Sequence, residues 1–317
     1  MSLAALRAGI ALVGRSLRRA LLEPEYPLLA VEVRPRALAA VRLAREGGRL
    51  ALAGAAVQAL PEGLLDVSPG RPNVTDPGAF RRVLQAVLER AGALSGGPMS
   101  LVLPDPVVRT TLVPAAGLRG GRQEVEEAIR FRLHKALPFD VRSARLAWSA
   151  ARADELLVAV AFHPAIEGYE QALAELGFQA GLVEATSLAL LSLVEREPVA
   201  GDRLLVNWDE TYVSFVLTRA GRPLLVRTLP GESDTEAVAA HAASTVRYVC
   251  DRFGGEGPEA VALRSACLPV AEAVEALRAA LGLVPQPIRL WAAGRAEPEA
   301  AGHALAGAAA SALRRAA

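Results

Sequence analysis

The sequence is poor in residues that mark several large classes of protein. Lys135 is the only lysine among 317 residues, and aromatic residues make up 4%. So few aromatics argue against stacking platforms for single-stranded nucleic acid. The formal net charge of +1 excludes a chain that is basic overall, as a dedicated nucleic-acid binder is. We therefore expect no nucleic-acid partner.

Long apolar runs are also missing. A helix needs about 20 apolar residues to span a bilayer, and the longest uncharged stretches, 91–104 and 300–313, are shorter and rich in small residues or proline. Alanine therefore accounts for most of the positive mean hydropathy of +0.28. Cys250 and Cys267 lack a metal-type spacing and suit a reducing cytoplasm without a disulfide.

Motifs for catalysis are absent from the sequence. It has no Walker-type phosphate loop and no Gly-x-Ser-x-Gly elbow. The four histidines are dispersed without metal-ligand spacing, so we interpret each as a surface or capping residue: His134, His163, His241 and His303. Asp209 and Glu210 are adjacent and are interpreted as turn residues, because neighbours on a strand point apart. We therefore expect no enzyme activity.

The first 25 residues predict an amphipathic helix. Apolar residues recur every three or four positions between Ser2 and Leu22, and no acidic residue precedes Glu23. Its basic residues are the candidates for contact with an anionic membrane surface: Arg7, Arg15, Arg18 and Arg19. The alternatives are a helix that binds a partner and a helix that docks on its own globule.

Strand and helix patterns then occur in two similar halves. Each half opens with a three-stranded meander, at 28–60 and at 204–229, and continues with helices and further strands. Gly47-Gly48 and Ala220-Gly221 supply hairpin turns. The apolar run Val183–Val194 predicts a helix, and an Ala-rich helix is predicted at 299–315. This duplication predicts an α/β protein with the two-lobed actin-like fold, a duplicated ribonuclease H-like unit.

Several segments together resemble the PilM family, the cytoplasmic actin-like component of the type IV pilus inner-membrane platform. The matching segments are 53–63, Leu103–Arg109, Glu124–His134 with Leu137-Pro138-Phe139, Ala239–Tyr248 and Ala304–Arg315. The resemblance implies a first lobe at 26–197 with an inserted subdomain at about 104–150, and a second lobe at 198–317. The related secretion protein GspL has its own transmembrane helix after the actin-like part, so the stand-alone pilus form fits better.

The resemblance fails where actin-like proteins bind a nucleotide. Two hairpin turns cradle the phosphates there, and glycine lets backbone N–H groups approach them. Each element that the family uses for this purpose is altered, and the degenerate positions are Glu32, Arg34, Ala39, Asn207, Asp209, Arg264 and Ser265. Pro35 also lacks an N–H group. We therefore expect no cofactor, with ATP as the disfavoured alternative, and expect Arg34 and Arg36 to face solvent or to bridge the lobes. The other interpretation of these two arginines is a different anion site.

What the resemblance implies is a binding role. The family holds the cytoplasmic N-terminal segment of a bitopic membrane partner, PilN, in a groove between the first lobe and its subdomain. Mapped by motif, the groove residues are Leu103, Pro104, Val107, Arg109, Leu133, Pro138 and Phe139. The expected protein is a non-catalytic scaffold in the cytoplasm, peripheral to the inner membrane, with other pilus platform proteins as further partners. An actin-like ATPase and a peripheral membrane protein that acts through its first helix are the alternatives, and self-association stays open.

Overall fold

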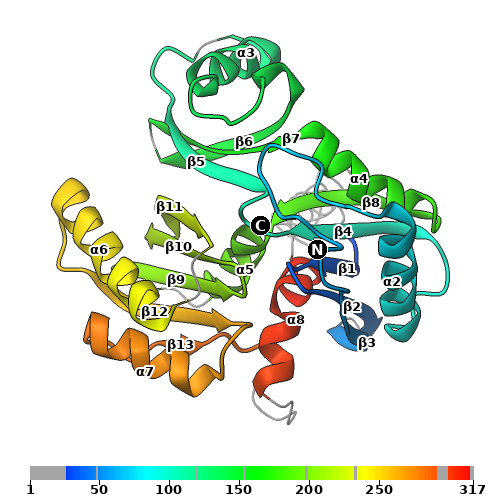
Figure 1. Cartoon of the computed structure of the whole chain (residues 1–317). Helices are drawn as coiled ribbons and strands as arrows, with labels where there is room; N and C mark the ends of the chain where they lie inside the picture. Colours follow the sequence, from blue (N-terminus) through cyan, green and yellow to red (C-terminus); the bar gives the residue numbers. More distant parts are fainter. Residues whose placement is uncertain are drawn as a thin grey trace, which may run out of the picture.

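The computed structural model describes residues 26–47, 49–118, 120–152, 154–196, 199–231, 234–290 and 299–314. The predicted N-terminal helix, with its four arginines, lies outside the described residues, as do Trp291 and Arg315 at the ends of two predicted elements. Within the described ranges the strands form two five-stranded sheets and one three-stranded sheet (Figure 1).

The first sheet carries the first meander. Strands β1 (Leu29–Val33), β2 (Ala37–Glu46) and β3 (Arg49–Ala59) pair antiparallel, and Gly47 adopts a positive φ of 57° in the β2–β3 turn. β4 (Gly97–Leu103) pairs parallel with β1, and β8 (Phe178–Ala185) pairs parallel with β4. The strand order is therefore β3-β2-β1-β4-β8.

The second sheet repeats this plan. Its order is β11-β10-β9-β12-β13, in which β9 (Asp202–Asp209), β10 (Tyr212–Arg219) and β11 (Arg222–Pro230) form the meander. β12 (Pro258–Ser265) and β13 (Gln286–Pro287) add in parallel. Ala220 and Gly221 both have positive φ, of 49° and 72°, as a two-residue type I′ hairpin requires. The duplication predicted from the sequence is confirmed by the matching strand orders.

The described elements stack in five layers. Helices α2 (Pro77–Arg90) and α4 (His163–Ala174) cover the outer face of the first sheet. Between the two sheets lie α5 (Thr186–Val194) and α8 (Glu299–Ala312). Helices α6 (Thr235–Phe253) and α7 (Val270–Leu281) cover the outer face of the second sheet. Small residues of α8 such as Ala306, Ala308 and Ala309 are completely buried, so this helix fits between the sheets.

The inserted subdomain lies between β4 and α4. Its sheet has the order β5-β7-β6, with β5 (Val108–Pro114), β6 (Ala144–Arg152) and β7 (Glu155–Phe162). Helix α3 (Arg122–Leu133) and the 3-10 turn η1 (Val141–Ser143) pack on it, with Ile129, Val158 and Val160 buried in a core of their own. The sheet continues to Phe162, past the boundary near residue 150 that the sequence predicts.

Two predictions need correction in detail. The apolar run Val183–Val194 is not one helix, because Phe178–Ala185 forms strand β8 and the helix begins at Thr186. The C-terminal helix α8, assigned by sequence to the second lobe, packs against β1, β2 and β4 of the first sheet as well as β12 of the second. Among the helices of the described ranges, none is both long enough and apolar enough to span a membrane.

Candidate functional site

The seven degenerate positions lie close to the junction of the lobes. Glu32 lies one residue before the end of β1, and Arg34 lies in the β1–β2 turn. Asn207 and Asp209 lie in the last part of β9, and Arg264 lies one residue before the end of β12. These five meet in one buried cluster. Ser265 lies beside it, where its backbone N–H donates to Nδ1 of His303 at 2.9 Å. Ala39 lies apart, in the apolar core between the sheets.

Arg264 is the centre of the cluster and is completely buried. Its Nη2 lies 2.8 Å from Glu32 Oε1, and its Nη1 lies 2.6 Å from Asp209 Oδ2. Nη1 also donates to Asn207 Oδ1 at 2.9 Å, and Nε donates to the carbonyl of His303 at 3.1 Å. One guanidinium therefore connects the first sheet, the second sheet and α8.

Arg34 makes a second bridge between the lobes. From the β1–β2 turn, its Nε lies 3.3 Å from Asp209 Oδ2 and its Nη2 lies 2.6 Å from Glu210 Oε1. Nη2 also donates to the carbonyl of Ala266 at 2.8 Å. Arg34 is buried whereas Arg36 is exposed, so of the two predicted placements Arg34 takes the bridge and Arg36 faces solvent.

Glu32 is held from a third direction by α8. Its Oε2 accepts from the backbone N–H of Gly307 at 3.1 Å and of Ala308 at 3.3 Å. The helix comes this close only because position 307 has no side chain, since an added Cβ would lie 2.5 Å from the Glu32 carboxyl carbon. The sequence predicted no role for this glycine.

Burial and charge act against each other on the carboxyl groups. Burial raises the pKa of Glu32, although Arg264 and Arg34 oppose it. Burial would also raise the pKa of Asp209, but the two guanidinium groups outweigh it and hold that pKa far below its usual range. Burial and the neighbouring Asp209 raise the pKa of Glu210 to about 8. Glu210 is therefore mostly protonated at neutral pH, and Asp209 is the carboxylate that the two guanidinium groups hold ionised.

His303 departs from the prediction that it is a surface or capping residue. It is 2% exposed, and burial together with Arg264 lowers its pKa to about 4. The ring is therefore neutral at pH 7. The sequence around His303 did not indicate that this side chain is buried, because its burial results from packing between the lobes.

A second buried network continues from the cluster. Asp105, which follows β4, accepts from the backbone N–H of Ser187 at 2.8 Å and from its hydroxyl at 2.5 Å. The same carboxylate accepts from Asn207 Nδ2 at 2.9 Å. Asn207 thus joins Asp105 to Arg264, and Asp105 in turn lines a large cavity on the subdomain side.

That cavity has a volume of about 610 Å³ and lies between the subdomain and the second lobe. Of the predicted groove residues, Val107, Arg109, Pro138 and Phe139 line it. Leu103 and Pro104 are buried behind it, and Leu133 belongs to the subdomain core. Sequence reasoning missed the opposite wall, which comes from β11 and includes Val226, Arg227, Thr228 and Pro230.

Two strand edges border this groove. Three consecutive residues of β5, Arg109–Thr111, and three of β11, Val226–Thr228, line the cavity. A strand shows only alternate residues on one face, so consecutive lining residues mark an edge. Both strands are the terminal members of their sheets, and β11 lies against β5. Such edges carry unpaired backbone N–H and C=O groups that an extended chain can join.

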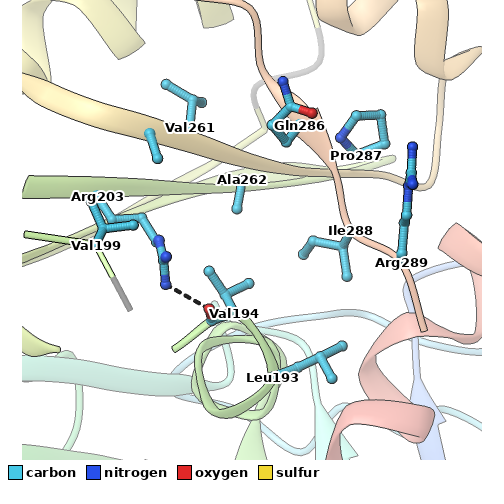
Figure 2. Close-up of a pocket in the computed structure, with 11 residues that line it drawn as sticks. Leu193, Val194, Val199, Arg203, Val261, Ala262, Gln286, Pro287, Ile288 and Arg289 are labelled. Carbon is cyan, nitrogen blue, oxygen red and sulfur yellow. Dashed lines mark hydrogen bonds between the residues drawn. The ribbon is translucent and has the colours of Figure 1, made fainter. Parts of the chain in front are cut away.

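A second cavity, of about 380 Å³, lies where α5 meets the second sheet (Figure 2). It is lined largely by apolar residues of α5, of β12 and of the segment that follows β13, such as Leu193, Val261 and Ile288. The guanidinium of Arg203 already donates to the carbonyl of Val194 at 2.5 Å. This cavity brings together no set of reactive groups, so the groove beside the subdomain is the stronger candidate.

Comparison with known proteins decides the fold. No protein-family model and no curated protein sequence matches the chain. The structure is similar to a PilM–PilN type IV pilus biogenesis complex, with a TM-score of 0.76 and 21% identity over 92% of this chain and 98% of that chain. It is also similar to a Bacteroides thetaiotaomicron protein with an actin-like ATPase fold and unknown function, with a TM-score of 0.51 and 10% identity over 83% and 90% of the chains.

The chain has the actin-like fold. The predicted fold class is therefore confirmed. A weaker similarity, with a TM-score of 0.48 and 13% identity over 76% and 82% of the chains, is to the cytoplasmic domain of EpsL, an inner-membrane component of the Vibrio cholerae type II secretion system.

In actin-like proteins that bind a nucleotide, the phosphates lie between the β1–β2 and β9–β10 turns. Here the Arg34 side chain crosses from the first turn to Asp209 and Glu210 at the second. Carboxyl groups face the space where phosphates would need N–H donors, and Pro35 supplies none. The Arg34 guanidinium is thus already bonded to groups of the second lobe. Within the described ranges, no group of three or more His, Cys, Asp or Glu side chains could hold a metal ion.

Proposed function

We propose that this chain is a non-catalytic scaffold of a type IV pilus, or related secretion, assembly platform at the inner membrane. In this role it binds the cytoplasmic N-terminal segment of a PilN-like membrane protein. The observation that carries the proposal is the groove of about 610 Å³ between β5 and β11, where four of the residues mapped by motif converge. The similarity in fold to PilM over 92% of the chain supports it.

The physical basis of binding is strand addition. An extended segment gains main-chain hydrogen bonds at an edge and places alternate side chains in pockets. The cavity offers apolar surface for such side chains at Val107, Leu137 and Phe139. The Phe139 ring is already fixed against Phe162, with ring centroids 5.1 Å apart, so this part of the wall is preorganised.

The proposal places the protein in the cytoplasm beside the inner membrane, with other platform proteins as further partners. The proposal includes no nucleotide, because the side chains of Arg34, Asp209 and Glu210 lie in the space between the β1–β2 and β9–β10 turns. These three residues, with Glu32, Asn207 and Arg264, are called the ion cluster below. Saturable binding of ATP·Mg²⁺ in isothermal titration calorimetry would contradict this part of the proposal.

Peptide titration tests the groove. The purified chain is titrated with a fluorescent peptide that copies the N-terminal segment of the PilN-like protein from the same genome, and we expect saturable binding in the micromolar range. The variant Thr111→Trp places a bulky ring at the β5 edge and should weaken binding at least about tenfold.

The matched control is Ser149→Trp, on the opposite edge of the same small sheet, where Ser149 is exposed. It should bind like the unmodified protein. No saturable binding by the unmodified chain, or equal binding by both variants, would reject the groove as the partner site.

A further inference from the structure

Three cations line the groove, and each comes from a different element. Arg109 belongs to β5, Lys135 follows α3, and Arg227 belongs to β11 of the second lobe. Arg109 and Lys135 are exposed, and Arg227 is half-buried. The groove therefore presents positive charge from both the subdomain and the second lobe.

These cations have neutral partners or none. Arg109 Nη1 donates to the carbonyl of Ala136 at 2.8 Å. Arg227 Nη1 donates to Thr245 Oγ1 at 2.8 Å and to Ser244 Oγ at 3.3 Å, both on α6. Among the residues that the structure describes, no carboxylate forms an ion pair with Arg109, Lys135 or Arg227. By contrast, Arg145 on β6, in the same three-stranded sheet as Arg109, forms an ion pair with Glu170 at 2.5 Å.

One carboxylate lines the groove, and it does not neutralise this charge. Asp105 is 4% exposed and accepts three hydrogen bonds, two from Ser187 and one from Asn207. Its oxygens are therefore committed to the interior of the molecule. The groove lining combines an apolar floor with three cations that lack a carboxylate partner.

We propose that the groove selects a partner segment that carries an acidic side chain. Arg227 of the second lobe binds this carboxylate together with Arg109 and Lys135. This inference rests on the proposed function and deepens it, because it names the chemistry of the bound segment and assigns a contact to the second lobe. Arginine and lysine bind a carboxylate through charge-assisted hydrogen bonds. The bound segment lies between β5 and β11 and touches both lobes.

The apolar lining and the two strand edges favour a peptide over a nucleic acid or a lipid headgroup. Val107, Phe139 and Val226 offer surface to aliphatic side chains, and edge N–H and C=O groups match a peptide backbone. The sugar-phosphate backbone of a nucleic acid uses neither the apolar surface nor the strand edges. The near-neutral net charge of the chain also argues against a dedicated nucleic-acid binder.

Peptide binding at two salt concentrations tests the inference. The probe is the N-terminal segment of the PilN-like protein, compared with the same peptide in which each Asp or Glu is replaced singly by Asn or Gln. We expect one replacement to weaken binding about tenfold, and the difference to shrink at high salt. Arg227→Gln and Lys135→Gln should lose affinity for the acidic peptide and bind the amide peptide as the unmodified protein does.

Arg82→Gln, on the exposed surface of α2, is the control and should leave both affinities unchanged. Circular dichroism melts identify any variant that fails to fold. Equal affinity for acidic and amide peptides, or tight binding of a segment without acidic residues, overturns the inference but leaves the proposed function intact. Failure of the unmodified chain to bind any form of the segment overturns the proposed function itself. A peptide with Lys at the selected position that binds Arg227→Glu better than the unmodified protein further supports the pairing.

Discussion

The guanidinium of Arg264 bonds to groups of the first sheet, the second sheet and α8. These bonds explain how its positive charge is stabilised inside the molecule. A single buried charge costs several kcal/mol, and removal of one member of a buried pair typically costs about 3–5 kcal/mol. Here Glu32, Asp209 and Asn207 satisfy Arg264 directly, while Arg34 shares Asp209. The cluster therefore fixes the position of one lobe relative to the other through directional bonds, in addition to the apolar core between the sheets.

Glu210 makes stability depend on pH. Its pKa rises from the ordinary value of 4.5 to about 8 in the folded chain. The folded state therefore keeps a proton that the unfolded state has released, and the stabilisation is complete below pH 4.5 and lost as the pH rises through about 8. The full shift corresponds to about 4 kcal/mol of unfolding free energy between about pH 5 and about pH 9. Solvent screens the partly exposed Glu210, so we expect the free energy of unfolding to fall by about 2 kcal/mol over this range through this group.

Urea denaturation of Glu210→Gln at both pH values measures this contribution, because glutamine does not titrate. The pH-dependent loss should be smaller in Glu210→Gln than in the unmodified protein. Glu46→Gln, at the exposed end of β2, should keep the full loss. An equal loss in all three proteins would exclude Glu210 as its source.

Individual residues of the cluster were identified from the sequence, but their contacts were not. Comparison with the PilM pattern marks Glu32, Arg34, Asp209 and Arg264 because each replaces a residue of the nucleotide site of actin-like proteins. The pairing of Arg264 with Glu32 joins positions 232 residues apart, so no local pattern predicts it. The interpretation of Asp209 and Glu210 as turn residues is correct for Glu210, whereas Asp209 ends strand β9, and it missed the contacts of both side chains with Arg34.

At the scale of elements, ambiguity of the apolar pattern accounts for the main error. The run Val183–Val194 is mostly apolar, and its apolar residues show no period that separates a buried strand from a buried helix. The strand β8 ends at Ala185 and α5 begins at Thr186, whose hydroxyl donates to the carbonyl of Leu103 at 3.0 Å. That contact fixes the start of the helix, and it depends on β4, which is distant in the sequence.

The meanders were predictable for the opposite reason. Their strands alternate with clear turns and pair with neighbours in the sequence, so Gly47 and the Ala220-Gly221 pair were sufficient to place them. The groove was half predictable. Motifs located the β5 wall and Phe139, whereas the β11 wall depends on how the second lobe packs against the subdomain.

Helix α8 offers a test of close packing at one glycine. Gly307→Ala would place a Cβ 2.5 Å from the Glu32 carboxyl carbon, and that carboxylate is held by Arg264 and by the helix backbone. Alanine alone gains about 1 kcal/mol in helix propensity, but overpacking costs about 1–3 kcal/mol and the buried ion pair is displaced as well. We therefore expect Gly307→Ala to lower the midpoint of thermal unfolding.

Gly302→Ala is the matched control in the same helix, because nothing lies within 4 Å of an added Cβ there. It should leave the midpoint unchanged or raise it. A Gly307→Ala protein as stable as Gly302→Ala would show that Glu32 moves away from α8 at little cost.

On the scale of the whole molecule, the groove and the ion cluster belong to one polar network. Asp105 lines the groove and accepts from Asn207, Asn207 accepts from Arg264, and Arg264 pairs with Glu32 and Asp209. The groove also takes one wall from each lobe. A bound segment that touches both walls favours the lobe arrangement that the cluster stabilises, so the two free energies are linked.

Arg34→Met tests this linkage, since Arg34 bridges the lobes and does not line the groove. Loss of the bridge leaves both groove walls intact but allows other lobe arrangements, and we expect affinity for the PilN-like segment to fall about three- to tenfold. Arg219→Met removes an ion pair with Asp202 that lies within the second lobe, so it should leave the affinity unchanged. A ligand stabilises the folded state more when it binds more tightly. A saturating concentration of the peptide should therefore raise the midpoint of thermal unfolding more for the unmodified protein than for Arg34→Met. Equal peptide affinities for Arg34→Met and the unmodified chain would show that the groove does not respond to the lobe arrangement, and that the cluster acts on stability alone.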